Sequence, residues 1–250
     1  ALVQALLDDA SGDGAGRVYN EFRVWENYGV AYGLEDAWGA SPLRLTEYDA
    51  LYAGVPMERL WELLNVGYVL TWRPVLNVPS TVLAEAQAAD GMEYAHRLAE
   101  PAPPAWLVHR VEEAGDSEAV ARLADPAFPV REAALVPPGT APALAEPPAG
   151  AAESVACSAD RLECRVGAAA PALLVLSRVD YPGWIAYVDG VRAPIVRADV
   201  ALQGVAVPAG AHVVRLAYRP ASLIAGGVIT LLSVAVALLC VIRASAGLRS

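Results

Sequence analysis

An uncharged apolar run near the C-terminus constrains this chain more than any other feature. Residues 221–242 read ASLIAGGVITLLSVAVALLCVI and contain no charged side chain. A helix of this length rises about 33 Å at 1.5 Å per residue, which is enough to cross the hydrocarbon core of a bilayer. A buried core helix is the alternative, but such helices rarely exceed about 18 residues without a charged face. The sequence therefore predicts one transmembrane helix over residues 220–243.

The charges around this run predict its orientation. Arg219 lies at its outer edge, Arg243 follows it directly, and Arg249 lies in a tail, residues 244–250, that has no acidic residue. Basic residues concentrate on the cytoplasmic side of a membrane span. We therefore expect a cell-membrane protein whose C-terminus is cytoplasmic and whose bulk is extracytoplasmic.

Charge and the opening residues bear on the partners of this chain. It carries 28 acidic and 18 basic residues, a formal net charge of −10, with the arginines dispersed along the sequence. Nucleic acid is therefore not an expected partner, because phosphate binding needs a basic patch.

The opening ALVQALLDDASGDGAG lacks the basic start and the long apolar stretch of a signal peptide. We expect upstream transmembrane helices of a longer parent protein as partners, or else a signal that has been removed.

Composition divides the rest of the chain into three regions. Residues 1–135 mix helical and strand patterns. Residues 136–150, VPPGTAPALAEPPAG, form a Pro/Ala/Gly linker that cannot continue a helix or a central strand. Residues 151–219 contain short strand patterns. The predicted fold class is α+β, with a mixed α/β N-terminal region, a C-terminal antiparallel β-sandwich of immunoglobulin-like or jelly-roll-like type, and the transmembrane helix.

The third region has the clearest strand signals. Short β-branched or aromatic runs alternate with turn signals that include Tyr181-Pro182-Gly183 and Asp189-Gly190. An Asp-Gly pair favours a two-residue hairpin turn because both positions tolerate positive φ. The predicted strands cover residues 173–179, 184–188, 200–207 and 212–219.

The first region shows helix and strand patterns in succession. Residues 57–65 have apolar side chains at helical spacing, and residues 66–72 follow as a buried strand. Residues 105–111 form a second predicted strand, and residues 116–124 a second helix. Ser117 is the expected N-cap of this helix, which Asp125-Pro126 would end.

Three cysteines leave two alternatives open. Cys157 and Cys164 flank a predicted hairpin, and Cys240 lies in the apolar run. A disulfide between the first two is permitted outside the cytoplasm and would contribute about 2.5 kcal/mol, but two reduced thiols fit the sequence equally well. The histidines lie far apart in unlike contexts, so no metal and no other cofactor is predicted.

A polar and aromatic cluster between residues 19 and 48 is the candidate sugar site. Aromatic rings can cover the apolar face of a sugar while carboxylates and amides bind its hydroxyls. The alternative assigns the rings to the core and the charges to a solvated rim. No catalytic residue is predicted, because adjacent carboxylates on a strand or helix do not flank one bond. The candidate sugar-binding residues are Trp25, Asn27, Tyr28, Tyr32, Glu35, Asp36 and Trp38.

The C-terminal motifs resemble a known family. Tyr181-Pro182-Gly183-Trp184, Val188-Asp189-Gly190, Arg197 and Pro208-Ala209-Gly210-Ala211-His212 follow one another and run into the apolar helix. This order is similar to the C-terminal end of YfhO-type bacterial membrane proteins, as is the segment 60–73, LWELLNVGYVLTWR. Pro104 and Pro129 depart from the family pattern, which often has Arg and Asp there.

The resemblance implies a polytopic protein related to GT-C-fold glycosyltransferases. Such a protein would take a lipid-linked sugar as donor and an envelope polysaccharide as acceptor, with its catalytic acids in a part that precedes these residues. The chain is then expected to be an extracytoplasmic accessory domain and membrane anchor. The alternative is a membrane-anchored carbohydrate-binding or protein-interaction module without catalytic activity.

Overall fold

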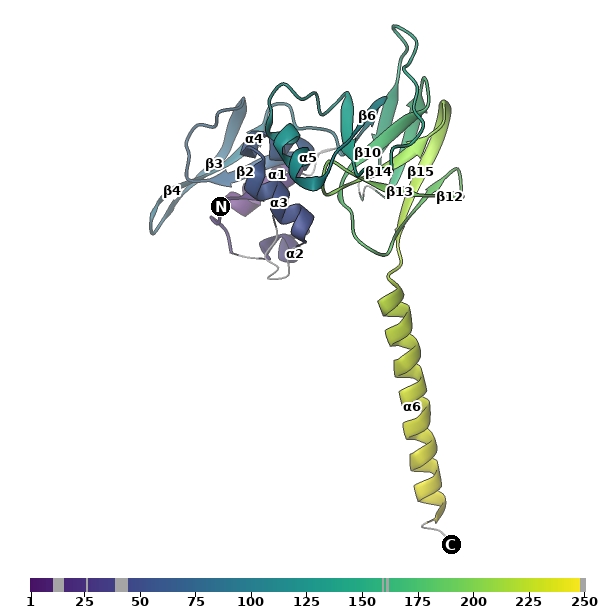
Figure 1. Cartoon of the computed structure of the whole chain (residues 1–250). Coiled ribbons are helices and arrows are strands. Elements are labelled where there is room, and N and C mark those ends of the chain that lie inside the picture. The colour runs from purple at the N-terminus through teal and green to yellow at the C-terminus, as the bar shows by residue number, and fades with distance from the viewer. Residues whose placement is uncertain (11–15, 26, 39–44, 159, 161, 248–250) are drawn as a thin grey trace.

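The computed structural model consists of a folded head and one long helix that extends from it (Figure 1). It describes the chain except residues 11–15, 26, 39–44, 159, 161 and 248–250. Helices and mainly antiparallel sheets confirm the predicted α+β class. Three clusters of buried hydrophobic residues form the interior of the head.

The N-terminal sheet has the strand order β1-β2-β4-β3. Strand β1 (Arg17–Asn20) runs parallel to β2 (Val66–Thr71), while β4 (Gly91–Leu98) is antiparallel to both β2 and β3 (Ser80–Ala88). Helix α1 (Leu2–Ala10) packs on this sheet through Leu2 and Leu6, which share a core with Tyr68 and Leu70. The predicted strand over residues 66–72 is confirmed as far as Thr71, and every residue of β2 is buried, whereas Trp72 follows the strand and is exposed.

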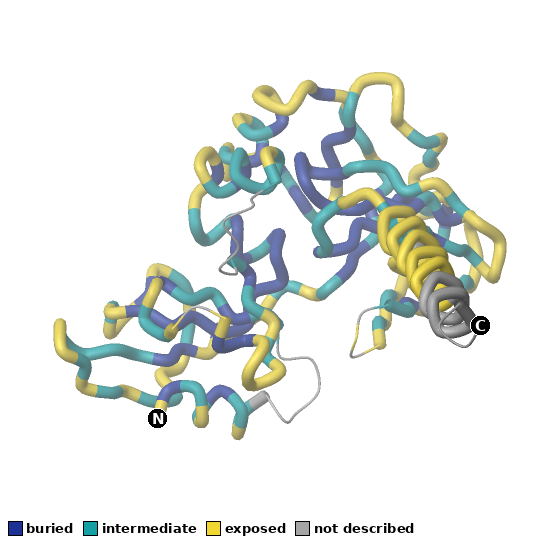
Figure 2. Tube along the Cα trace, turned by 90° about the horizontal axis from the view of Figure 1, so that it is seen from below, coloured by how far each residue is buried: buried dark blue, intermediate teal, exposed yellow. Residues whose placement is uncertain are grey.

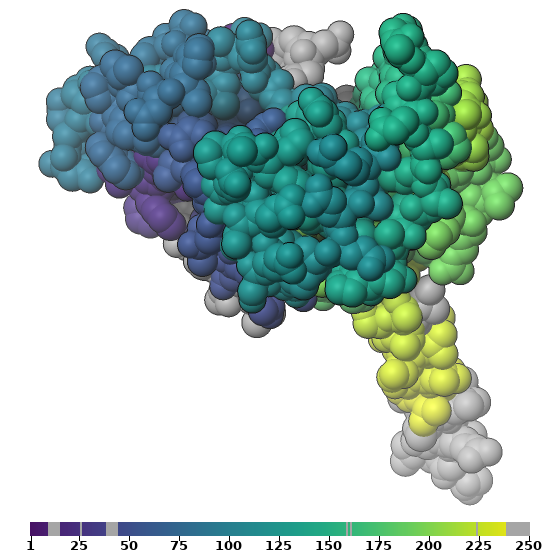
Figure 3. Space-filling model, turned by 45° about the horizontal axis from the view of Figure 1, so that its top comes forward, coloured from purple at the N-terminus to yellow at the C-terminus, as the bar shows by residue number. Residues whose placement is uncertain are grey.

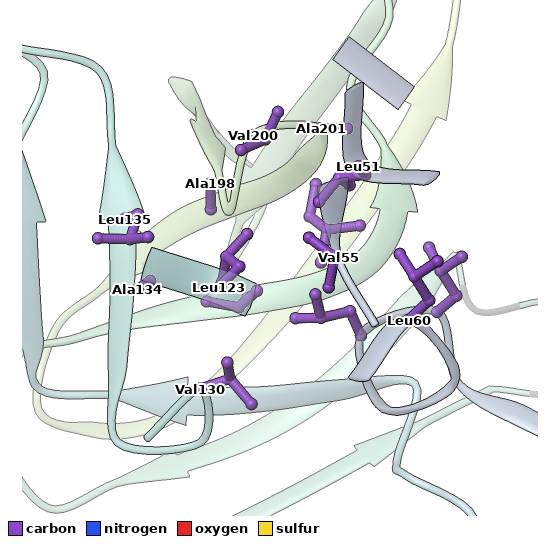
Figure 4. Close-up of a cluster of buried hydrophobic side chains, with 14 of the residues drawn as sticks. Leu51, Val55, Leu60, Leu123, Val130, Ala134, Leu135, Ala198, Val200 and Ala201 are labelled. Carbon is purple, nitrogen blue, oxygen red and sulfur yellow. The ribbon is translucent and has the colours of Figure 1, made fainter. Parts of the chain in front are cut away.

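Five further elements of this region surround the largest core. They are α3 (Thr46–Gly54), α4 (Met57–Leu63), α5 (Asp116–Ala124) and the parallel pair β6 (Arg110–Glu113) and β7 (Ala133–Val136). Helix α2 (Tyr28–Tyr32) instead contributes Tyr28 to the core beneath α1. Helices α4 and α5 confirm the two predicted helices. Figure 4 shows the core side chains pointing toward one another, among them Leu51, Leu60, Leu123, Leu135 and Val200.

Two local predictions for this region are wrong. Ser117 is not the N-cap of α5, because Gly115 holds that position and no side chain caps the helix. Residues 105–111 are not one strand, because β5 (Ala105–Val108) ends before His109 and β6 starts after it. The His109 side chain contacts residues outside these strands. Its Nδ1 lies 2.9 Å from Ala145 O and its Nε2 lies 3.0 Å from Glu153 Oε1.

The predicted antiparallel sandwich is formed by two sheets. One has the order β13-β14-β10-β5 and the other β12-β11-β15-β9-β8, with antiparallel pairing throughout. The bounds are β8 (Ser154–Cys157), β9 (Glu163–Ala168), β10 (Ala172–Val179), β11 (Trp184–Val188), β12 (Val191–Ala193), β13 (Ile195–Ala198), β14 (Leu202–Val207) and β15 (Gly210–Tyr218). Asp189 and Gly190 both have positive φ, 51° and 82°, as the predicted hairpin turn requires.

Strand β10 joins the sandwich to the first region. Its neighbour β5 belongs to the first predicted region, residues 1–135, whereas β10 belongs to the third. The two regions therefore share one sheet, although the predicted linker, residues 136–150, separates them in the sequence. Leu173 and Val175 point into the large core with α3 and α5, whereas Leu174 and Leu176 point into the sandwich core. This alternation follows from the two-residue period of a strand that is buried on both faces.

The predicted linker lies against the head. Residues 137–150 form no helix or strand. Ala145 N–H donates to Pro171 O at 3.0 Å, and Leu144 packs on the large core. The Pro/Ala/Gly segment is therefore an extended part of the fold, in keeping with a proline-rich composition.

Helix α6 (Ala221–Gly247) leaves the head directly after β15 (Figure 1). It continues past residue 243 through part of the predicted tail. Its window Ala221–Leu238 is long and apolar enough to cross a membrane, and none of that window is buried. Figure 2 looks from below, with the exposed helix in yellow in front of the head.

Candidate functional site

The structure does not gather the seven predicted sugar-binding residues into one surface. Tyr28 is buried in the core beneath α1, and Asn27 precedes α2 with a positive φ of 65°. Trp25 and Tyr32 are 89% and 54% exposed, away from the hollows described below. The remaining three residues, Glu35, Asp36 and Trp38, follow α2.

Backbone pairing with β1 positions these three residues. Val18 N–H donates to Glu35 O and Ala37 N–H to Val18 O, both at 2.8 Å, so Asp36 forms a parallel bridge with Val18. Asp36 Oδ1 accepts the Trp38 backbone N–H at 2.8 Å. Glu35 Oε2 accepts from Arg17 Nε at 3.1 Å. Each of the two carboxylates therefore has a local partner, the Arg17 side chain for Glu35 and a backbone N–H for Asp36.

Trp38 belongs to a cluster of aromatic rings. Its ring centroid lies 3.8 Å from that of Tyr52 on α3, which in turn lies 5.2 Å from Tyr48 and 6.3 Å from Tyr19 on β1. The Tyr48 hydroxyl donates to Ala37 O. Burial raises the pKa of Tyr48 to about 12 and that of Tyr52 further in the same direction. These phenols stay neutral at physiological pH and can bind a ligand only by stacking and hydrogen bonding.

A hollow of about 580 Å³ opens beside these rings, here called the Trp38 hollow. Phe22 is 70% exposed, and its positive φ of 57° turns the chain at this point. Aromatic faces combined with a few polar groups are the usual lining of a carbohydrate site. The lining residues include Tyr19, Asn20, Phe22, Trp38, Asp49 and Tyr52.

A second hollow of about 390 Å³ lies on the sandwich side of Trp38. Arg17 and Arg178 both line it, from β1 and β10. Arg17 Nη1 donates to Leu64 O at 2.8 Å and to Ser177 Oγ at 2.9 Å, which links the two sheets. Burial, together with the neighbouring Arg17 charge, lowers the pKa of Arg178. The arginines are held by the fold, so this hollow is a polar seam between the two regions.

Trp184 both packs on the sandwich core and lines a hollow. It packs against the sandwich core, with its ring 5.0 Å from that of Tyr218 and 4.7 Å from Arg178 Cζ. It also lines a third hollow, of about 590 Å³, together with Tyr181, Pro182 and Arg192. We call this the foot hollow, because it lies where the sandwich meets α6.

Cys157 and Cys164 form a disulfide, the first of the two alternatives. They face each other across the β8–β9 pair with an S–S distance of 1.99 Å. Within the described part of the chain, no three His, Cys, Asp or Glu side chains come together as metal ligands.

Several residues of these hollows lay outside the predicted set. Asp49 and Tyr52 could have been included in the predicted site from the sequence. They lie three residues apart on the helix that also carries Tyr48, and residues at this spacing are neighbours on a helix surface. Phe22, Arg17 and Arg178 carry no such signal, since only the three-dimensional fold brings them to Trp38.

Known proteins do not identify the site. No protein family, no curated protein and no solved structure matches this chain.

Proposed function

We propose that this chain is the extracytoplasmic head and membrane anchor of a larger envelope protein of the YfhO type that its sequence resembles. The observation that supports this most is α6, whose described apolar side chains, within Ala221–Leu238, find no cover on the head. An uncovered span of this kind is stable only in lipid or among other membrane helices. The net charge of −10 fits a head that faces an aqueous compartment.

In this proposal the head assists glycosyl transfer and does not catalyse it. The Trp38 hollow would hold part of an envelope polysaccharide acceptor, close to the membrane in which a lipid-linked sugar donor resides. Glu35 is ion-paired with Arg17, and Asp36 accepts a backbone N–H, so both carboxylates serve the local fold. Upstream transmembrane helices of the parent protein would provide the catalytic acid and the donor site.

Cysteine labelling in intact cells tests the anchor and its orientation. A cysteine at Thr140, which is exposed on the head, should react with a membrane-impermeant thiol reagent. A cysteine at Ser250 should react only after the cells are opened. Background labelling is measured with Cys240→Ser, which removes the thiol of the span. The reverse labelling pattern would refute the proposed orientation, and release of the chain by carbonate washing would refute the anchor.

A second candidate function is a carbohydrate-binding module that acts without a catalytic partner. The aromatic lining of the Trp38 hollow favours it. Glycan-array and calorimetric binding should be lost in Trp38→Ala and kept in Trp25→Ala, because Trp25 is 89% exposed and does not line the hollow. Thermal melts of both variants show whether the head stays folded. Equal effects of the two substitutions would exclude the hollow as the glycan site.

A further inference from the structure

The foot hollow lies at the point where the chain would enter the membrane. Arg219 N–H donates to Gly183 O at 2.7 Å, and Pro220 packs so closely on Gly183 that a Cβ there would lie 3.0 Å from Pro220 Cα. The positive φ of Gly183, 111°, lets the turn approach the chain this closely. Helix α6 begins at the next residue, Ala221, and Figure 3 shows it leaving the head beneath the sandwich.

Amphipathic aromatic side chains gather at this junction. The Tyr181 ring lies 6.5 Å from that of Tyr218, and the Trp184 ring lies 5.0 Å from the same tyrosine. Tyr181 and Tyr218 are each 46% exposed. Trp and Tyr are enriched at the headgroup level of membranes, where one end of the ring system is apolar and the other is hydrated. The foot of the sandwich therefore has the composition of a membrane-interface surface.

Two arginines lie in or next to the lining of the foot hollow. Arg192 lines the foot hollow, Arg219 precedes α6, and both are exposed. Among the described residues neither forms an ion pair with a carboxylate. By contrast, Arg197 and Arg215 on the same sandwich are each 2.7 Å from a carboxylate oxygen.

The foot hollow is also lined by one acidic side chain, Asp180, whose ionisation is disfavoured by burial. Asp180 is half-buried, and this burial raises its pKa, although the Arg197 charge acts in the opposite direction. An anion that enters the hollow thus meets arginine charge, tyrosine and tryptophan rings, and a carboxyl group that ionises less readily than usual.

We infer that the foot hollow binds the phosphate headgroup of an anionic phospholipid in the leaflet where α6 begins. Arg192 and Arg219 would pair with the phosphate oxygens while Tyr181 and Trp184 pack against the glycerol and the upper acyl chain. The headgroup would fix the orientation of the head above the membrane. This inference rests on the proposed membrane anchor.

The test uses the full 250-residue chain in phosphatidylcholine nanodiscs that contain a minority of phosphatidylglycerol. Native mass spectrometry measures the ratio of the two lipids that remain bound when the disc is dissociated. We expect enrichment of phosphatidylglycerol that falls about fivefold in Arg192→Gln and further in the Arg192→Gln/Arg219→Gln double variant, since one basic side chain typically contributes this much attraction to an anionic membrane surface. The matched control is Arg165→Gln, which removes an exposed arginine of β9 that has no carboxylate partner among the described residues and does not line the foot hollow.

The outcomes separate the inference from the proposed anchor. A chain that does not enter nanodiscs overturns both. A chain that enters them but shows no phosphatidylglycerol enrichment, or loses it equally in Arg165→Gln and Arg192→Gln, overturns the headgroup site alone. Displacement of the lipid by inorganic phosphate at equal concentration would show that the hollow selects a free anion, which also overturns the lipid assignment. Melting temperatures that match the wild type show that the variants are folded.

Discussion

Replacing Asp199 by Asn should raise the stability of the head at alkaline pH. Asp199 is fully buried at the turn between β13 and β14. Its Oδ1 accepts the Leu135 N–H at 2.9 Å, and its own N–H donates to Leu135 O at 2.8 Å. Oδ2 has no hydrogen-bond partner among the described residues. Burial raises the pKa of this carboxyl to about 7.

The magnitude follows from the difference between the folded and unfolded pKa. A rise from 3.8 to about 7 is roughly three pKa units, which corresponds to about 4 kcal/mol at 1.36 kcal/mol per unit. The folded protein binds the proton more tightly, so the unfolding free energy falls as pH rises from about 4 to about 7 and is then constant. Asn keeps the bond from Leu135 N–H but leaves a buried amide N–H₂ unpaired at a cost of about 1–3 kcal/mol. The net gain at pH 8 should therefore be about 1–3 kcal/mol.

Urea unfolding of the detergent-solubilised chain, followed by circular dichroism at pH 5 and pH 8, measures this effect. Asp199→Asn should be more stable than the wild type at pH 8 and no more stable at pH 5. Asp90→Asn is the control, because Asp90 is exposed at the end of β3 and pairs with Arg23 at the surface. If Asp199→Asn shows the same dependence on pH as the wild type, the carboxyl is not the group that titrates and the reasoning fails.

Three further substitutions and one activity assay test other parts of the structure. Gly16→Ala should destabilise the head by about 3 kcal/mol, because a Cβ there would lie 2.3 Å from Asn65 O, and a thermal melt checks this. Trp184→Ala should cost about 2 kcal/mol in the same assay, less than the 3–5 kcal/mol typical of a fully buried ring; no loss would mean that the ring does not pack. Cys157→Ala/Cys164→Ala should lower stability by about 2.5 kcal/mol under oxidising conditions and match the wild type under reducing conditions. The purified chain should transfer no sugar from polyprenyl-phosphate donors; turnover abolished by Glu35→Gln would contradict this.

Local sequence signals predicted the elements whose structure is decided locally. The α5 pattern ends at Asp125-Pro126 as expected, because proline disfavours helical backbone in the preceding residue. The β11–β12 hairpin follows from Asp189-Gly190. The β3–β4 hairpin carries an Asp-Gly pair as well, Asp90-Gly91, but its strands were not predicted, because β3 consists largely of alanine and polar residues and has few of the β-branched and aromatic residues that are typical of strands.

Features set by distant contacts could not be predicted. The ring of Trp38 was a candidate, but its neighbours Tyr52 and Arg178 reach it only because α3 and β10 pack on the same core. The break at His109 depends on Ala145 and Glu153, which lie far along the chain. The different burial of Trp25 and Tyr28 was likewise not predictable. Tyr28 is buried because it packs with Leu2 and Leu6 of α1, whereas Trp25 remains exposed.

The pairing of β5 with β10 has a consequence for the order of folding during synthesis. Residues 105–108 are synthesised before residues 173–176, so β5 has no partner until the later strand follows. The second sheet is completed only by β15, which directly precedes α6. Long-range strand pairing is slow, and unpaired apolar strands aggregate readily. A head of this topology therefore completes its fold only once β15 has been synthesised, and we expect chaperones to protect β5 until β10 meets it.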